Sequence, residues 1–470
     1  MLKVLSDYYQ ATAKFSRNAK LYLGSQFLGA LGFSAFGVIF NLYLAEGALP
    51  EGFIGNILSV SALAGSIAAL PAGLTSDRIG RKRALLFSLL LLCISVLIKA
   101  TTLNKDILLA VAAFSGLAGA LAGVTDYPFL MENSTPEEQI HLFSVNGSLM
   151  FITMVIGSAL GGRLPEVFLR CLPDITRFQS YRLTLMISAL FSFSALIPLV
   201  FLRESARSAK VVQAKVSWGE KKDLITIGKF SIINLFMGAG AGLVIPFFNL
   251  YFAKRFGATS TQIGLYFSGF FLITAAATLL VPIAAKRLGR VRTIFYAYML
   301  SLPCLVLLGW LERYLTFAVL AYWIRGCLMN MSQPLLGAMR MEMIPEKKRA
   351  TAESISDISS NLPWAGATSF SGRLMQSQGI TIGRVSLPGY SLPYYLTALL
   401  YFLSASCFYL FFKGYEKRDQ EAGEAHHYLR AALQRFRAHI RHHPPGAHGE
   451  HIRTTYHRHD MEVISGSNLP

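Results

Sequence analysis

The sequence is dominated by long apolar runs. Hydrophobic segments of about 20 residues follow one another along most of the chain, separated by short polar breaks. That is the length an α-helix needs to cross the hydrocarbon core of a bilayer. The runs exclude a soluble enzyme and a secreted domain. They also argue against a transmembrane β-barrel, whose strands alternate between apolar and polar residues. We therefore predict an all-α integral membrane protein.

Twelve of these runs are long enough to be membrane-spanning helices. The first six are residues 21–45, 52–74, 84–102, 107–131, 142–164 and 183–202, and the second six are residues 227–252, 263–284, 293–311, 317–339, 355–374 and 394–412. An even number of spans places both termini on one side of the membrane. Most Lys and Arg residues outside the spans fall on that side, so the positive-inside rule predicts cytoplasmic termini in the cell membrane.

Polar segments surround and divide the spans. We predict a cytoplasmic N-terminal segment (1–20), a six-helix bundle (21–203), a basic cytoplasmic linker (204–222), a second six-helix bundle (223–413) and a cytoplasmic tail (414–470). The tail holds nine of the ten His residues and a short apolar stripe at helical spacing. The stripe predicts an amphipathic helix lying on lipid. The irregular His spacing favours a solvated tail over a metal site.

The net charge of +18 does not indicate a nucleic-acid partner. The basic residues lie at the ends of apolar runs instead of forming one folded basic patch, so they report membrane topology. Phosphate-binding loops, dinucleotide motifs and metal-ligand spacings are absent from the sequence. We expect no cofactor, no metal and no enzymatic activity. The expected partners of the monomer are membrane lipid, a small-molecule substrate and a coupling ion, the proton.

The two halves of the chain are related in sequence. FNLY occurs at residues 40–43 and again at residues 248–251, an offset of 208. Further pairs at almost the same offset are IGRKR (79–83) with LGRVR (288–292), GGRL (161–164) with SGRL (371–374), and Glu132 with Glu342. Repeated halves of the same orientation are an architecture of secondary transporters, whose substrate site lies near mid-membrane where the halves meet.

The turn after the second span resembles a known signature. Residues 73–83, GLTSDRIGRKR, resemble the G-x-x-x-D-R-x-G-R-K/R motif between helices 2 and 3 of the major facilitator superfamily. A degenerate copy, KRLGRVR at residues 286–292, falls between helices 8 and 9. The resemblance covers about residues 20–413. It implies twelve helices in two pseudo-symmetric six-helix bundles, a cavity lined by helices 1, 4, 7 and 10, and transport by alternating access.

The same resemblance implies a cytoplasmic gate. Asp77 would face the positive N-terminus of helix 11 in the other half. Arg81 would reach an acid at the end of helix 4, with Asp126 and Glu132 as the candidates, and Arg290 would reach Glu342. The alternative is that these charges only set topology. The gate residues are Gly73, Asp77, Arg78, Gly80, Arg81, Lys82, Glu132, Arg287, Arg290 and Glu342.

A few polar residues lie inside the predicted spans. Arg325 is near the middle of helix 10, where a charge costs at least roughly 2.5–3.5 kcal/mol. We interpret it as a substrate contact or coupling counter-ion, with a structural ion pair as the alternative. Asp126 is either a proton-coupling carboxylate or the gate acid. Further substrate candidates, each of which could instead serve in packing or interhelical hydrogen bonds, are Asn41, Asn249, Tyr322, Asn330, Gln333, Asn361 and Trp364.

The sequence therefore predicts a secondary active transporter of a small organic solute, coupled to protons. Efflux of amphipathic compounds is favoured by the apolar, sparsely charged helices. Two departures weaken the drug/proton antiporter interpretation, because Ser158 replaces the proline of the helix 5 motif and helix 4 lacks the arginine of many drug exporters. The alternatives are an uptake carrier for an anionic metabolite, suggested by Arg325, and a non-transporting sensor.

Overall fold

The computed structural model describes residues 12, 15–203, 221–311, 313–345, 348–382 and 385–415. Most of the predicted N-terminal segment, nearly all of the linker and the tail with its expected amphipathic helix lie outside the described residues. The chain divides into two compact units, Met1–Phe411 and Phe412–Pro470. The first unit contains both helical bundles. Of the second unit only residues 412–415 are described, as the end of a helix.

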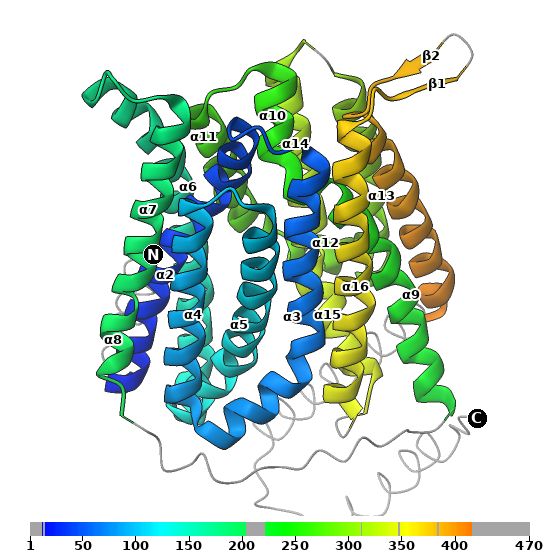
Figure 1. Ribbon diagram of the computed structural model, residues 1–470. Helices are drawn as coiled ribbons and strands as arrows, with labels where there is room; N and C mark the ends of the chain where they lie inside the picture. The colour runs from blue at the N-terminus through cyan, green and yellow to red at the C-terminus, as the bar shows by residue number, and fades with distance from the viewer. Residues whose placement is uncertain are drawn as a thin grey trace, which may run out of the picture. The chain divides into compact units, whose positions relative to one another are not determined.

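The first part of the described chain forms one helical bundle, the N-bundle (Figure 1). Its helices are α2 (Arg17–Glu46), α3 (Glu51–Ile79), α4 (Arg81–Thr101), α5 (Lys105–Glu132), α6 (Pro136–Cys171), α7 (Arg177–Ser194) and α8 (Leu196–Val200). Helix α2 packs on α6 and α7, and α5 packs on α3 and α4. The sixth predicted span is divided between α7 and α8, which meet at Ala195.

The second part forms the C-bundle. Its helices are α9 (Lys221–Val244), the 3-10 turn η1 (Ile245–Phe247), α10 (Phe248–Phe256), α11 (Ser260–Thr278), α12 (Val281–Leu288), α13 (Arg290–Trp310), α14 (Leu315–Met331), α15 (Gln333–Met343), α16 (Arg349–Gln376) and a final helix, Leu392–Tyr415. Three predicted spans are interrupted next to Pro246, Pro282 and Pro334. Proline has no N–H to donate and its ring crowds the preceding turn, which explains these breaks.

Ten helices among the described residues are long and apolar enough to cross a membrane. The other two predicted spans coincide with α14–α15, which break at Ser332, and with the more polar α16. The predicted helical membrane fold is confirmed, and the structure is consistent with twelve spans. One element departs from it, an antiparallel hairpin of β1 (Ile380–Ile382) and β2 (Val385–Leu387). Strands of three residues are too short to show an alternating pattern in the sequence.

The helices run up and down, so each bundle has two ends. One end carries the α3–α4 turn and Arg203, after which the linker begins, and we call it the linker end. The opposite end carries the β1–β2 hairpin, and we call it the hairpin end (Figure 1). Many large apolar side chains remain exposed along the helices, including Leu70 and Leu279. Such a surface suits contact with lipid hydrocarbon instead of water.

Short connections determine where several helices begin. Thr135, Thr176 and Thr259 each open a helix with a capping box, in which a Glu or Gln three residues later bonds back to the cap. Gly80 and Gly289 precede α4 and α13 with φ of 89° and 86°. A residue with a Cβ atom is strained in this backbone region, so both turns of the repeated motif depend on glycine.

Candidate functional site

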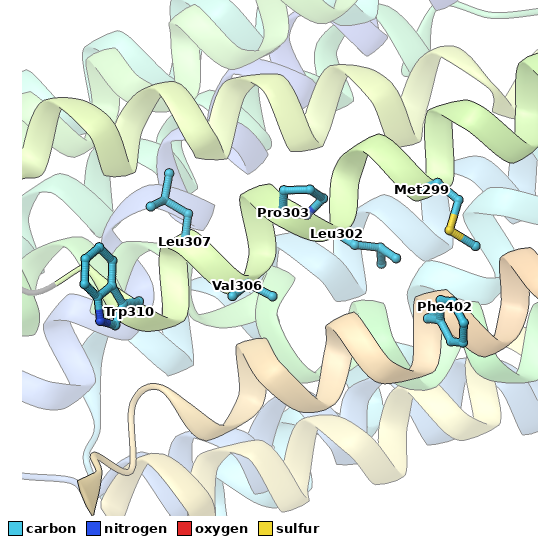
Figure 2. Close-up of a pocket in the computed structure, with 7 residues that line it drawn as sticks. All are labelled: Met299, Leu302, Pro303, Val306, Leu307, Trp310 and Phe402. Carbon is cyan, nitrogen blue, oxygen red and sulfur yellow. The ribbon is translucent and has the colours of Figure 1, made fainter. Parts of the chain in front are cut away.

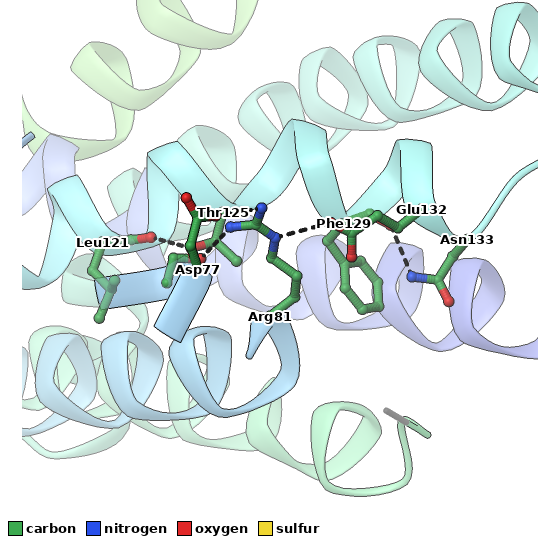
Figure 3. Close-up of polar contacts among 8 residues, drawn as sticks. Asp77, Arg81, Leu121, Thr125, Phe129, Glu132 and Asn133 are labelled. Atoms are coloured by element: carbon green, nitrogen blue, oxygen red, sulfur yellow. Dashed lines mark hydrogen bonds and ion pairs between the residues drawn. The ribbon is translucent and has the colours of Figure 1, made fainter. Parts of the chain in front are cut away.

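The gate residues of the N-bundle cluster around Arg81 at the linker end. Its guanidinium contacts the Asp77 carboxylate at 2.6 Å and the Glu132 carboxylate at 3.1 Å, and it donates to Ser76 Oγ at 2.8 Å. Thr125 Oγ1 donates to the same serine oxygen at 2.9 Å. Figure 3 shows this network joining the α3–α4 turn to the end of α5. Of the two candidate acids, Arg81 therefore contacts Glu132.

The C-bundle repeats part of this arrangement. Arg290 contacts Glu342 at 2.6 Å, as the sequence repeat predicts. Lys286 occupies the position that corresponds to Asp77, so the second copy lacks the acid of the turn. The remaining gate candidates lie near the surface, with Gly73 next to open space, Lys82 half-buried, and Arg78 and Arg287 exposed.

The prediction that Asp77 faces the N-terminus of helix 11 is not met in this structure. Asp77 pairs with Arg81 of its own bundle, and the ion pairs Arg81–Glu132 and Arg290–Glu342 are likewise each internal to one bundle. Hydrogen bonds between the bundles lie instead toward the hairpin end, and one lies halfway along α11, where Ser268 donates to the Val155 carbonyl. The sequence motif predicts which residues would form a gate, but it does not specify which partners they contact in a given conformation.

Asp126 lies on α5, six residues before Glu132 at the end of that helix, and its carboxylate contacts side chains of α2. The Tyr22 hydroxyl donates to Asp126 Oδ1, and Gln26 Nε2 donates to Asp126 Oδ2 at 3.3 Å. Gln26 also donates to the Tyr22 oxygen at 2.8 Å. Asp126 is therefore not the acid of the Arg81 network. It is a half-buried carboxylate held by two neutral donors, where α5 meets α2.

Arg325 is buried inside the C-bundle, with 3% of its surface exposed. It donates to the Tyr401 hydroxyl at 2.8 Å, and its guanidinium lies 5.4 Å from the Tyr401 ring centre and 5.9 Å from that of Phe248. Its Nε has no hydrogen-bond partner among the described residues. The alternative of a structural ion pair is not supported there, because the neighbours of this charge are aromatic rings and a neutral hydroxyl.

A second buried cation, Lys99, was not predicted from the sequence. Its ammonium group donates to Ser115 Oγ at 2.7 Å and lies 5.8 Å from the centre of the Phe40 ring. Phe40 and Phe248 are equivalent in the repeat. Because Lys99 lies three residues from the end of its apolar run, it has the sequence signal of an ordinary flanking residue. Only the packing of α4 against α5 and α2 reveals that it points inward.

The other substrate candidates separate into buried and exposed residues. Asn41 and Asn249 contact each other between the bundles at 3.1 Å. Tyr322 packs among aromatic rings of the C-bundle, with the Phe248 ring centre at 4.5 Å. Trp364 is half-buried and its backbone packs against Gly242. The remaining three, Asn330, Gln333 and Asn361, are exposed polar residues on α14, α15 and α16.

Two polar contacts between α3 and the C-bundle were not expected from the sequence. The Tyr390 hydroxyl donates to Glu51 at 2.7 Å, and Ser369 donates to Asn56 at 2.6 Å. Burial and the hydrogen bond to Glu51 raise the pKa of Tyr390 above its ordinary value, so its hydroxyl remains a donor at neutral pH. These contacts join α3 to α16 and to the segment after the hairpin.

An apolar groove of about 570 Å³ lies between α13 and the final helix. Figure 2 shows its lining, with Phe402 facing the side chains of α13. The lining residues are Met299, Leu302, Pro303, Val306, Leu307, Trp310 and Phe402. None of them is a substrate candidate from the sequence. A groove with this lining suits hydrocarbon, such as a lipid chain, and offers no recognition of a polar solute.

Comparison with protein families decides the identity of this fold. The sequence profile of the Major Facilitator Superfamily matches residues 22–229 and again residues 230–447. The chain belongs to the Major Facilitator Superfamily. The two matches begin within α2 and α9, the first helices of the two bundles, in agreement with the sequence repeat. Its membership makes the chain a multi-pass membrane transporter.

The individual proteins that resemble this chain do so at low sequence identity. The efflux pump azaK of Aspergillus niger is 27% identical over 297 residues, which are 58% of this chain and 59% of that protein. The match thus spans less than two thirds of that relative. The solved nucleoside transporter NupG has a TM-score of 0.66 at 15% identity, covering 84% of this chain and 99% of that one.

A solved D-xylose–proton symporter has a TM-score of 0.64 at 15% identity and covers 83% of this chain and 95% of that one. At such low sequence identity, these structural similarities establish a common fold. They give no information on the substrate of this chain.

Proposed function

We propose that this chain is a secondary active transporter of a small organic solute, driven by the proton gradient through alternating access. It would lie in the cell membrane with both termini in the cytoplasm, so that the linker end faces the cytoplasm. The concentration of cross-bundle contacts at the hairpin end then corresponds to an inward-facing state. In this state the proposed gate residues form ion pairs within their own bundle, as Arg81 and Arg290 do.

The observation that carries proton coupling is the environment of Asp126. A half-buried carboxylate with two neutral donors and no cationic partner among the described residues can exchange a proton without breaking an ion pair. The site has no counterpart in the other bundle. The offset of 208 takes Tyr22 to Phe230, and the offset of 210 between Glu132 and Glu342 takes Asp126 to Leu336. A purely architectural carboxylate would be expected in both halves.

Efflux is the favoured direction. The support is the relationship to the efflux pump azaK, together with helices that carry few charges. Amphipathic compounds enter such a transporter from the membrane or the cytoplasm, and both routes reach an inward-facing state. The D-xylose–proton symporter among the structural neighbours is a proton-coupled transporter of the same fold.

One observation supports a second candidate, the uptake of an anionic metabolite. Arg325 is a buried cation without a carboxylate partner among the described residues, and its Nε lacks a hydrogen bond. A buried charge in a membrane protein is costly unless a ligand or partner compensates it. A carboxylate or phosphate group of a substrate would supply that compensation in another conformation of the bundles.

Both candidates are tested by flux into proteoliposomes that contain the purified protein and an imposed pH gradient. Lipophilic cations, nucleosides and organic anions are added in turn while an enclosed dye reports proton movement. We expect one class to drive proton movement, and Asp126→Asn to abolish that movement while the ligand still raises the melting temperature. Asp106→Asn is the matched control, because it removes an exposed acid at the other end of the same helix.

The outcomes separate the candidates. Proton movement driven by lipophilic cations supports efflux, whereas movement driven by anions and lost in Arg325→Gln supports the metabolite carrier. Proton movement that persists in Asp126→Asn would remove this carboxylate from coupling. Ligand binding without gradient-dependent flux of any class would favour a sensor.

A further inference from the structure

Asn41 of α2 and Asn249 of α10 form a hydrogen-bonded pair between the two bundles. Asn41 Nδ2 donates to the Pro246 carbonyl at 2.7 Å and to Asn249 Oδ1 at 3.1 Å. Asn249 Nδ2 donates to the Val38 carbonyl at 3.0 Å. Both side chains are at most 5% exposed. The pair therefore joins the first helix of one bundle to the seventh span of the chain in a buried interface.

The contacts of this pair obey the symmetry of the repeat. Asn249 is 208 residues after Asn41, and Pro246 is likewise 208 residues after Val38 (249 − 41 = 246 − 38). Each carboxamide thus donates to the carbonyl three residues before the other asparagine. Two hydrogen bonds related in this way place the local two-fold axis of the bundles between the two side chains.

The backbone explains why an amide side chain is needed opposite Pro246. Pro246 belongs to η1, the 3-10 turn between α9 and α10, so the helix is broken there. Inside a membrane, backbone groups freed by such a break must be satisfied by a neighbouring helix. Asn41 supplies that donor for Pro246. Asn249 Oδ1 also accepts from the Leu250 N–H at 2.9 Å.

The same bonds argue against the alternative that these asparagines contact substrate. Both N–H groups of Asn41 are used, by the Pro246 carbonyl and by Asn249. Asn249 directs its N–H groups to Val38 and, at 3.4 Å, to Gly37. With their donors engaged and their side chains buried, the two carboxamides have nothing to offer a solute in this state.

The pair lies within a wider region of contact at the hairpin end. Two further hydrogen bonds join the bundles through residues that follow Asn41 closely in the sequence. They are the bonds of Glu51 with Tyr390 and of Asn56 with Ser369. The backbones also approach closely, since a Cβ at Gly55 would lie 2.7 Å from the Thr368 carbonyl oxygen of α16. Opening of the hairpin end must separate these surfaces, and the asparagine bonds must break with them.

We propose that Asn41 and Asn249 form a symmetric gate that holds the hairpin end closed and opens when the transporter faces the other side. They are positioning residues that bias the conformational equilibrium, and they do not bind the solute. The assignment rests on the alternating access of the proposed function. The shared bond between the two side chains makes them act as one unit, so their removal is not additive.

The test measures opening directly, without substrate or gradient. Ser260→Cys places a reporter at a 5% exposed position of α11, in a chain whose five native cysteines are replaced by serine. A bulky water-soluble maleimide labels it only when the hairpin end opens. Asn41→Ala and Asn249→Ala should each raise the labelling rate about fivefold, as expected for a net loss of one hydrogen bond. The double variant should fall below the product of the two single effects.

Asn234→Ala is the matched control, because Asn234 of α9 donates at 3.5 Å to the Ser356 carbonyl within the C-bundle. It should leave the labelling rate unchanged. An unchanged rate in both single gate variants would overturn the proposal, and so would an equal rise in Asn234→Ala, since that would indicate general loosening. Because the assay needs no transport, its failure is distinct from failure of the proposed function.

A double cysteine variant provides a test if the alanine variants do not fold. Asn41→Cys together with Asn249→Cys, joined by a short cleavable bis-thiosulfonate, should keep the hairpin end closed. Transport by the joined protein should stop and return when a reductant cleaves the bridge. Undiminished transport by fully joined protein would overturn the gate.

Discussion

The N-bundle and the C-bundle share a scaffold down to single hydrogen bonds. Tyr43 donates to the Ala100 carbonyl at 3.1 Å, and Tyr251, 208 residues later, donates to the Leu308 carbonyl at 2.7 Å. Leu308 is in turn 208 residues after Ala100. The glycine turns before α4 and α13 and the ion pairs Arg81–Glu132 and Arg290–Glu342 repeat in the same way.

The buried charges do not repeat. In the N-bundle they are the half-buried Asp126, between α5 and α2, and the buried Lys99, between α4 and α5. In the C-bundle the corresponding positions are leucines, namely Leu336 for Asp126 and Leu307 or Leu308 for Lys99. The C-bundle instead buries Arg325, whose N-bundle equivalents are Gly116 or Leu117.

This difference separates architecture from chemistry. Contacts found in both bundles hold helices together, and the proposed gates would have to work alike on both sides of an approximate two-fold axis. A buried charge in only one bundle has no such structural requirement and costs free energy where it lies. We infer that recognition of the solute and proton coupling reside in the residues that break the symmetry.

The largest expected effect comes from removing the charge of the C-bundle. Arg325→Gln should lower transport by about 100-fold, the scale of a lost hydrogen bond to a charged group. Expression and the melting temperature should stay near those of the parent protein. Lys99→Gln makes the equivalent change in the N-bundle, and flux measured in parallel shows which bundle provides the essential cation. A fully active Arg325→Gln variant would remove this arginine from the mechanism.

An intermediate effect is expected where the two bundles are alike. Gly80→Ala and Gly289→Ala each force a side chain into a backbone region that is nearly exclusive to glycine, at a cost of about 1–3 kcal/mol. Because the two turns have nearly the same φ, the two variants should lower the melting temperature of detergent-purified protein by similar amounts. A large drop for one variant and none for the other would show that the turns are not structurally equivalent.

The smallest expected effect concerns the acid that only one turn possesses. Asp77→Asn removes one of the two carboxylates that contact Arg81, so the arginine keeps Glu132. Loss of Asp77 should still weaken the closed state of the linker end and raise cysteine labelling from that side about threefold, the scale of one exposed ion pair. Lys286→Asn, at the corresponding position, is the control and should change nothing. Unchanged labelling in Asp77→Asn would show that the acid does not contribute to the gate.

Much of the fold could be predicted, because the bilayer limits what an apolar run can become. Breaks within spans were less predictable, although Pro246, Pro282 and Pro334 lie close to three of them. The candidate site was predicted unevenly. Arg325 is recognisable as a charge in the middle of an apolar run, whereas Lys99 is concealed by its position near the end of one. The choice of Arg81 between Asp126 and Glu132 depended on side-chain directions that spacing does not specify.

The sequence by itself determined the helical membrane architecture, the repeat of the two halves and the residues of the gate motif. Each follows from local physics, since a span in hydrocarbon must satisfy its own backbone hydrogen bonds and a basic turn must remain in water. The tertiary structure alone decided which residues meet across helices. The Tyr22–Gln26–Asp126 contact, the inward direction of Lys99 and the Asn41–Asn249 pair all join segments far apart in the chain. They depend on how rigid helices pack and on which end of the bundles is closed, and no local pattern encodes either.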